Sequence, residues 1–128
     1  MNDTYSHEGG DLVLKSVVNL VKECLRNTDL IGRYGGEEFV IYLPNTPITI
    51  AAQMAEAIRV KIASGHVRYM NEPIHVTSSF GVSSIFQHNE SKDTITSLIK
   101  QADQALYRAK RSGRNRVECS IETSTMPR

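Results

Sequence analysis

The segment Arg33-Tyr-Gly-Gly-Glu-Glu-Phe39 joins two glycines directly to two carboxylates and an aromatic ring. The residues on either side are rich in β-branched, aromatic and other apolar types, which is typical of two short strands. Gly35 and Gly36 are therefore predicted to form the turn of a β-hairpin, with Glu37 and Glu38 at the start of the second strand. A turn without Cβ atoms lets a ligand approach the backbone closely, and a carboxylate beside it can hold a divalent cation. The residue types alone also fit an ordinary hairpin turn.

Composition limits the classes of function that the chain can have. The length of 128 residues suits one compact domain, predicted here over residues 1–119 with a tail at 120–128. Fifteen basic and fourteen acidic side chains give a net charge of +1, which argues against broad electrostatic binding to nucleic acid or to a membrane surface. Any recognition of an anion must therefore be local.

The two cysteines, Cys24 and Cys119, lie far apart and form no CxxC pair, so neither a disulfide scaffold nor structural zinc is supported. No apolar segment is long enough to span a bilayer, and no signal-peptide pattern is present. We expect a cytoplasmic chain without direct membrane contact, although a parent protein could be membrane-anchored.

Periodicity predicts three helices and four strands. Apolar residues recur at helical spacing over residues 10–26 and 47–62, and again from Asp93 or Thr94 to just before Gly113. Besides the hairpin, strands are predicted at 74–86 and 116–119, and Gly81 within the first indicates a bulge or a close backbone approach. This order favours an α+β fold with helices packed on a mostly antiparallel sheet.

Four ordered segments of the chain resemble the GGDEF family of diguanylate cyclases. These are residues 2–11, 33–39, 79–82 and 102–115, and the similarity runs from Asn2 to about Val117. The resemblance implies a palm-like fold, as in nucleotide cyclases and polymerases, and the condensation of two GTP into cyclic di-GMP with release of two pyrophosphates. It further implies Mg²⁺ or Mn²⁺, a catalytic homodimer with one GTP in each subunit, and a sensory domain in the parent protein.

The resemblance also implies roles for residues that would contact the nucleoside of GTP. Asn2 and Asp11 match positions that hydrogen-bond guanine, which suits an amide and a carboxylate. Gly35 and Gly36 match the loop beneath the phosphates and ribose. From residue type alone, Asn2 also fits a turn and Asp11 a helix-start carboxylate.

Four charged residues match positions that would act on the phosphates. Glu37 matches the metal ligand and is implied to help deprotonate the attacking 3′-hydroxyl. Glu38 belongs to the same catalytic motif, with a role that its chemistry defines less closely. Lys110 and Arg114 match groups that hold the terminal phosphates, but cations at the end of a helix also favour its dipole without any ligand.

Five residues separate the segment Arg26-Asn-Thr-Asp29 from Gly35. In the GGDEF family an Arg-x-x-Asp stretch at this offset forms an inhibitory site for the product. An arginine can clamp a phosphate or stack on guanine, and an aspartate can accept hydrogen bonds from the guanine edge. A local ion pair between residues three apart is the alternative.

One family element does not appear in the sequence. Family members carry a strand before the segment that begins at Asn2, with an Asp that joins the glutamate in metal binding, and no residue precedes Met1 here. We therefore expect little or no cyclase activity from residues 1–128 alone. The alternative function is a non-catalytic module that binds cyclic di-GMP or GTP; a nucleic-acid-binding module is less favoured because the central strands lack paired aromatics for base stacking.

Overall fold

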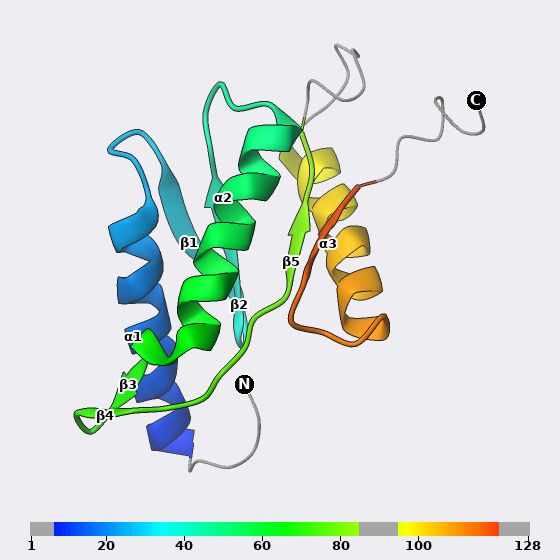
Figure 1. Cartoon of the computed structure of the whole chain (residues 1–128). Helices are drawn as coiled ribbons and strands as arrows, with labels where there is room; N and C mark the ends of the chain where they lie inside the picture. Colours follow the sequence, from blue (N-terminus) through cyan, green and yellow to red (C-terminus); the bar gives the residue numbers. More distant parts are fainter. Residues whose placement is uncertain (1–6, 85–94, 121–128) are drawn as a thin grey trace. The chain divides into compact units, whose positions relative to one another are not determined.

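The computed structural model describes residues 7–84 and 95–120. Along the chain, the elements are α1 (His7–Cys24), β1 (Leu30–Gly35), β2 (Glu38–Tyr42), α2 (Ile48–Lys61), a π-helical turn η1 (Ile62–His66), β3 (Arg68–Tyr69), β4 (Glu72–Pro73), β5 (Phe80–Val82), α3 (Ile95–Arg111) and β6 (Val117–Cys119) (Figure 1). Two compact units are distinguished: Met1–Pro44 with Ala57–Ser78, and Asn45–Glu56 with Ser79–Arg128. Helices combined with short, mostly antiparallel strand pairs confirm the predicted α+β class.

In the first unit, α1 buries one apolar face. Val13, Ile62 and Val67 are at most 1% exposed, because α1, η1 and the start of the β3 segment pack together. The backbone N–H of Arg68 donates to Ser16 Oγ across 3.1 Å, which ties β3 to α1. The remaining buried apolar side chains of this unit are Leu14, Leu20, Val21 and Ile58. Amphipathic spacing in the sequence thus translates directly into this core.

The described strands form three two-stranded sheets, in which β1–β2 and β3–β4 are antiparallel and β5–β6 is parallel. The predicted strand over 74–86 is therefore too long, since only Phe80–Val82 pairs. Its partner β6 spans Val117–Cys119, so three residues of each strand are paired. Residues 85–94 lie outside the described residues.

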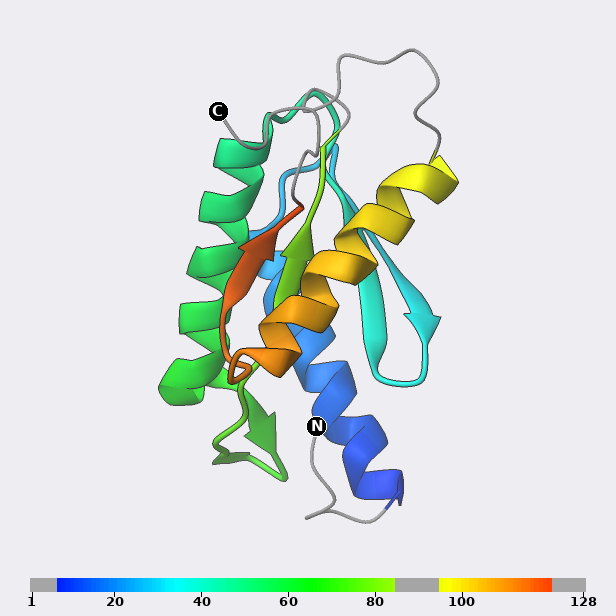
Figure 2. The same cartoon turned by 90° about the vertical axis from the view of Figure 1, so that its right-hand side faces the viewer.

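The second unit places α3 directly against β5 and β6 (Figure 2). Ala105 and Ala109 of α3 are fully buried, and their small side chains let the helix backbone come close to the strands. A Cβ atom added to Gly81 would run into the carbonyl oxygen of Ala102 and the backbone N of Leu106, and would lie 2.9 Å from the Cα of Leu106. The close backbone approach predicted at Gly81 is therefore confirmed.

Both predicted glycine stops follow helices in left-handed conformations: Gly65 has φ 86° and Gly113 has φ 118°. Cys24 and Cys119 are both free. Among the described residues, no helix combines the length and the apolar character needed to cross a bilayer.

We expect Gly81→Ala to destabilise the protein by about 2–4 kcal/mol, because its methyl group must displace the backbone of α3 rather than a flexible side chain. Urea unfolding measures the change. Gly10→Ala is the matched control, since nothing lies within 4 Å of a Cβ at that helical position. It should be neutral or stabilise by about 0.5–1 kcal/mol. Equal effects of the two substitutions would contradict the packing described for Gly81.

Candidate functional site

The hairpin turn differs by one residue from the sequence prediction. Arg33 pairs with Phe39 and Gly35 pairs with Glu38, so Tyr34 is an extra residue on β1 and forms a bulge. The two turn residues are consequently Gly36 and Glu37, not Gly35 and Gly36. Glu37 is exposed in the turn, while Glu38 is half-buried as the first residue of β2. The bulge thus moves Glu37 out of the strand, where alternation would have fixed its direction.

The two glycines of the motif have different local requirements. Gly36 has φ 52°, a left-handed conformation that favours glycine, whereas Gly35 does not have a positive φ. A Cβ atom at either position would meet nothing within 4 Å. The protein fold therefore explains glycine at position 36, but it leaves open space above Gly35.

Arg33 closes the turn from the preceding strand. Its guanidinium donates to the carbonyl oxygen of Gly36 through Nε at 3.1 Å and Nη2 at 2.6 Å. Sequence reasoning did not single out Arg33; its position two residues before a Gly-Gly pair is the signal that could have found it. These two bonds hold the backbone directly before Glu37.

The residues around the turn offer oxygen ligands for a hard cation such as Mg²⁺. Glu37 and Glu38 supply carboxylates beside an open glycine backbone, and this donor set fits part of a magnesium site. Within residues 7–84 and 95–120, no three His, Cys, Asp or Glu side chains cluster closely enough to enclose a metal. Asp11 is exposed on α1, and Asn2 lies outside the described residues.

Arg26 and Asp29 form the most developed polar contact of the first unit. The guanidinium donates from Nε to both carboxylate oxygens of Asp29, at 3.2 and 3.0 Å, and from Nη2 to Oδ1 at 2.9 Å. The backbone N–H of Arg26 donates to Oδ2 at 2.9 Å. The local ion pair that the sequence left open as the alternative is therefore present, with the Asp29 side chain completely buried and that of Arg26 46% exposed.

This contact changes the acidity of both partners and borders a pocket. The hydrogen bonds from Arg26 lower the pKa of the Asp29 carboxyl below its usual value, although burial acts in the opposite direction. The carboxylate raises the pKa of Arg26 in turn. A pocket of about 330 Å³ adjoins the pair and is lined by Lys22, Leu25, Arg26, Asn27, Asp29, Leu30 and Ile31. The exposed part of Arg26 and the apolar side chains of this pocket can thus contact a ligand, while the buried Asp29 carboxylate stays bonded to Arg26.

The second unit holds the two residues matched to phosphate binding. Lys110 is half-buried near the end of α3, and Arg114 is exposed just beyond it. Three consecutive residues, Gly113, Arg114 and Asn115, have positive φ angles of 118°, 63° and 48°. Left-handed conformations of this kind in residues other than glycine often occur at functional sites.

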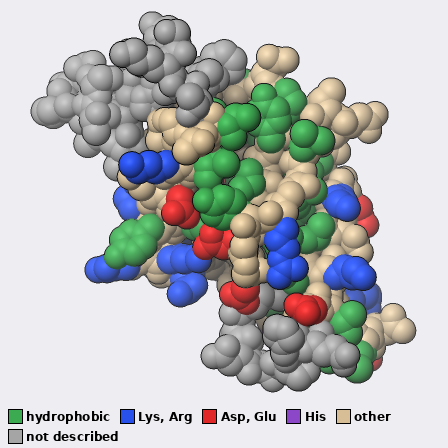
Figure 3. Space-filling view, turned by 180° about the vertical axis from the view of Figure 1, so that it is seen from behind, with side chains coloured by type: hydrophobic (Ala, Val, Ile, Leu, Met, Phe, Trp, Pro, Cys, Tyr) green, Lys and Arg blue, Asp and Glu red, His purple; other side chains and the backbone are tan. Residues whose placement is uncertain are grey.

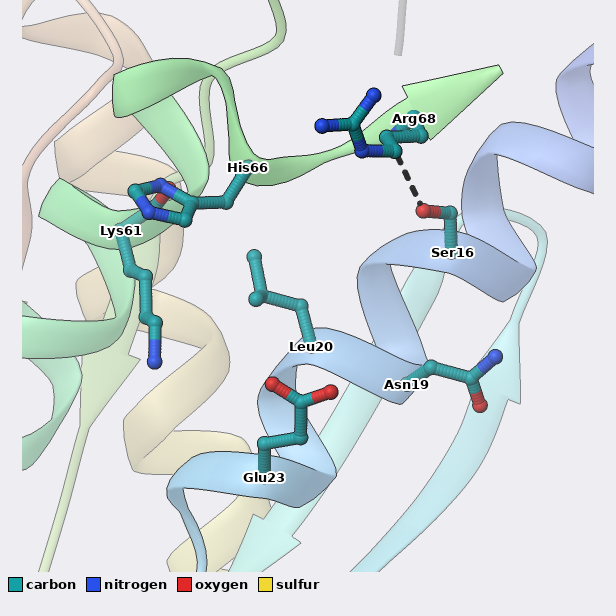
Figure 4. Close-up of a pocket in the computed structure, with 7 residues that line it drawn as sticks. All are labelled: Ser16, Asn19, Leu20, Glu23, Lys61, His66 and Arg68. Carbon is teal, nitrogen blue, oxygen red and sulfur yellow. Dashed lines mark hydrogen bonds between the residues drawn. The ribbon is translucent and has the colours of Figure 1, made fainter. Parts of the chain in front are cut away.

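A second pocket in the first unit, of about 420 Å³, is a weaker candidate. It is lined by Ser16, Asn19, Leu20, Glu23, Lys61, His66 and Arg68. Figure 4 shows that the Lys61 ammonium and the Arg68 guanidinium point in different directions, with the Leu20 side chain of α1 between them. These cations therefore do not converge on one anion. On the face seen in Figure 3, basic and acidic side chains are likewise interspersed rather than gathered into one charged surface.

Comparison with known proteins identifies the family. Residues 1–116 match the family described as diguanylate cyclase, GGDEF domain. The chain belongs to the GGDEF family. Its sequence is 44% identical over 120 residues to Diguanylate cyclase A of Treponema denticola, covering 94% of this chain and 32% of that protein. The chain thus spans about a third or less of the length of the first curated relatives that it matches.

Solved GGDEF structures match the fold as well as the sequence. The active GGEEF domain of a diguanylate cyclase from Vibrio cholerae superposes with a TM-score of 0.82 at 36% identity, covering 94% of this chain and 74% of that one. The GGDEF domain of DgcB from Caulobacter crescentus, solved in complex with c-di-GMP, gives 0.79 at 33% identity, covering 92% and 68%. The predicted membership of the GGDEF family is confirmed.

We expect the Arg26–Asp29 pair to make stability depend on pH in the acid range. Because folding lowers the pKa of Asp29, its contribution is fully present above the unfolded value of about 3.9 and is lost as pH falls through the lower folded value. Urea unfolding of wild type and Asp29→Asn between pH 3 and 7 tests this. Wild type should be more stable at pH 7, and the difference should shrink below about pH 4. A constant difference across this range would contradict the assignment.

Proposed function

We propose that the protein is a diguanylate cyclase that condenses two GTP into cyclic di-GMP and two pyrophosphates. The observation that carries this proposal is the Gly36–Glu37 turn, in which a carboxylate stands outside the strand ladder next to open glycine backbone. Membership of the GGDEF family and the similarity to named diguanylate cyclases support it. We place the activity in the cytoplasm, where GTP is available.

In this proposal the hairpin receives the reacting end of GTP. The open backbone at Gly35 and Gly36 admits the phosphates and ribose, and Arg33 holds the carbonyl of Gly36 through two hydrogen bonds. Glu37 and Glu38 are the catalytic carboxylates, and Glu37 would hold Mg²⁺ or Mn²⁺. When bound, the cation supplies positive charge that neutralises the phosphates and activates the 3′-hydroxyl.

Other residues would orient the rest of the nucleotide. Asn2 and Asp11 hydrogen-bond the guanine base, and Lys110 and Arg114 hold the terminal phosphates. Two subunits face one another as a homodimer, so that each 3′-hydroxyl attacks the α-phosphate of the partner's GTP and each pyrophosphate leaves. A two-fold arrangement matches a product with two identical linkages. A sensory domain in the parent protein would regulate this step.

The pocket beside Arg26 and Asp29 supports a second site for the product. Its arginine can donate to a phosphate of cyclic di-GMP, and its apolar wall can contact a base. We propose product feedback through this site. The same pocket favours the alternative function, a sensor that binds cyclic di-GMP or GTP without turnover. That residues 1–128 alone have little activity remains a prediction. Activity is therefore best measured on full-length protein.

The function is tested most directly at Gly35. Because a methyl group at this position meets nothing in the protein itself, Gly35→Ala should fold with unchanged stability. It should nevertheless lower the turnover of GTP with Mg²⁺ by about 10- to 100-fold, because the methyl group would occupy space needed by the phosphates.

The matched control is Gly32→Ala, in the same strand and with equally open surroundings. It should form cyclic di-GMP at the wild-type rate. Wild-type turnover by Gly35→Ala would contradict the proposed binding of GTP phosphates at this turn. A full-length protein that binds cyclic di-GMP but forms none from GTP would establish the sensor instead.

For the product site, we expect Arg26→Ala to weaken cyclic di-GMP binding by at least about tenfold, as removal of one charge-assisted contact does. GTP turnover should persist and lose its inhibition by added product. Calorimetry and inhibition assays measure the two effects. Lys15→Ala, which removes an exposed cation of α1 outside the pocket, should leave both unchanged. Retained feedback in Arg26→Ala would rule out this site.

A further inference from the structure

We propose that Ser79 and Arg116 are positioning residues that hold Arg114 in the conformation with which it binds the terminal phosphates of GTP. The inference deepens the proposed function and rests on it, since Arg114 is matched to phosphate binding by family resemblance. What is new is the assignment of two residues that would not touch the nucleotide. All the contacts involved lie within the second unit.

The backbone around Arg114 is held in an unfavourable form. Arg114 and Asn115 both have left-handed conformations, which cost free energy in residues that carry a Cβ atom. Two such residues in succession would relax to ordinary conformations unless neighbouring groups opposed it. The N–H of Arg114 donates to the carbonyl of Ala109 at 2.9 Å, which fixes where the loop leaves α3. The rest of the loop needs other partners.

Ser79 provides the first of these partners. Its hydroxyl oxygen accepts a hydrogen bond of 3.1 Å from the backbone N–H of Asn115. The next residue, Phe80, donates its own N–H to the carbonyl of Arg116 at 2.9 Å. Ser79 and Phe80 therefore hydrogen-bond two successive residues of the loop, Asn115 and Arg116, directly after Arg114. Of these two bonds, only the one to Ser79 uses a side chain and can be removed by substitution.

Arg116 provides the second partner. Its Nε–H donates to the carbonyl oxygen of Arg114 at 3.3 Å, and its Nη2 lies so close to Gly113 that an added Cβ would be 3.1 Å away. The guanidinium thus lies close to the backbone of the left-handed turn. Ser79 holds the N–H of Asn115 and Arg116 holds the carbonyl of Arg114, so the backbone of Arg114 is fixed while the residue itself is exposed.

A fixed backbone favours phosphate binding because less conformational freedom is lost when the ligand arrives. The long side chain of Arg114 still has to be ordered, but its starting point and direction are already set. Loss of either positioning contact should therefore weaken contacts to the terminal phosphates and leave contacts to the nucleoside intact. A general loss of stability would weaken both alike.

The test compares two probes on full-length protein with Mg²⁺: GMP, and an unreactive GTP analogue with a methylene group between the α- and β-phosphates. Ser79→Ala, Arg116→Ala and Arg116→Lys should each reduce the preference for the triphosphate over GMP by about three- to tenfold, the size expected for one ordinary hydrogen bond. Ser79→Thr keeps the hydroxyl and should keep the preference. Arg116→Lys keeps the positive charge but loses the planar set of N–H donors. It therefore distinguishes positioning of the Arg114 backbone from simple attraction of the phosphates to a charge at residue 116.

Two matched controls show what the loss of one hydrogen bond elsewhere in the second unit does to stability and to the preference for triphosphate. Ser83 donates its hydroxyl to the carbonyl of Leu98 at 2.7 Å, and Arg108 donates to the carbonyl of Cys119. Ser83→Ala and Arg108→Ala remove comparable bonds away from the loop, and should lower the unfolding temperature without changing the preference for triphosphate.

The outcomes separate the two levels of the proposal. Wild-type preference in Ser79→Ala, or in Arg116→Lys, together with a lost preference in Arg114→Ala, would overturn the positioning roles and leave the proposed function intact. An unchanged preference in Arg114→Ala, or a wild-type protein that binds neither probe, would overturn the phosphate-binding role and the positioning inference with it.

Discussion

Left-handed backbone next to a charged residue is the constraint on which the candidate site depends. Gly36 adopts it directly before Glu37, and Arg114 adopts it together with its neighbours. In each place an arginine close in sequence donates to the carbonyl of the left-handed residue: Arg33 to Gly36 and Arg116 to Arg114. For a residue other than glycine this conformation costs about 1–2 kcal/mol, which these bonds help to offset. The same kind of contact therefore holds the backbone directly before Glu37 in one unit and that of Arg114 in the other.

The two motif glycines illustrate how fold and function can require the same residue type for different reasons. At Gly36 the positive φ angle would disfavour any side chain, even in the absence of a ligand. At Gly35 neither the φ angle nor a neighbouring atom excludes a methyl group. Glycine at position 35 is thus unexplained by the protein alone, as is glycine at position 32. Only Gly35 belongs to the family motif, and in the proposed function the approach of GTP accounts for it.

Much of this arrangement could be predicted from the sequence, and the errors have specific physical causes. Helical spacing of apolar residues located the three helices, and the glycine at position 81 indicated a bulge or a close backbone approach, which the structure shows to be the contact with α3. The turn was misplaced because a bulge at Tyr34 shifts the register without changing the composition of either strand. The strand at 74–86 was overestimated because alternating residue types do not show where pairing with β6, a partner remote in sequence, begins. Ser79, likewise, acquires a role only through a loop 36 residues away.

The Arg26–Asp29 pair shows that the two readings of a motif need not exclude one another. Sequence analysis set a local ion pair against a ligand site, and the ion pair is present. A guanidinium has five N–H donors in a planar fork, and its Nε and Nη2 bond to Asp29. With 46% of the arginine side chain exposed, the guanidinium can donate to a phosphate while it keeps its carboxylate partner. In the proposed product site, the buried Asp29 would orient the arginine, so the ion pair would support binding rather than exclude it.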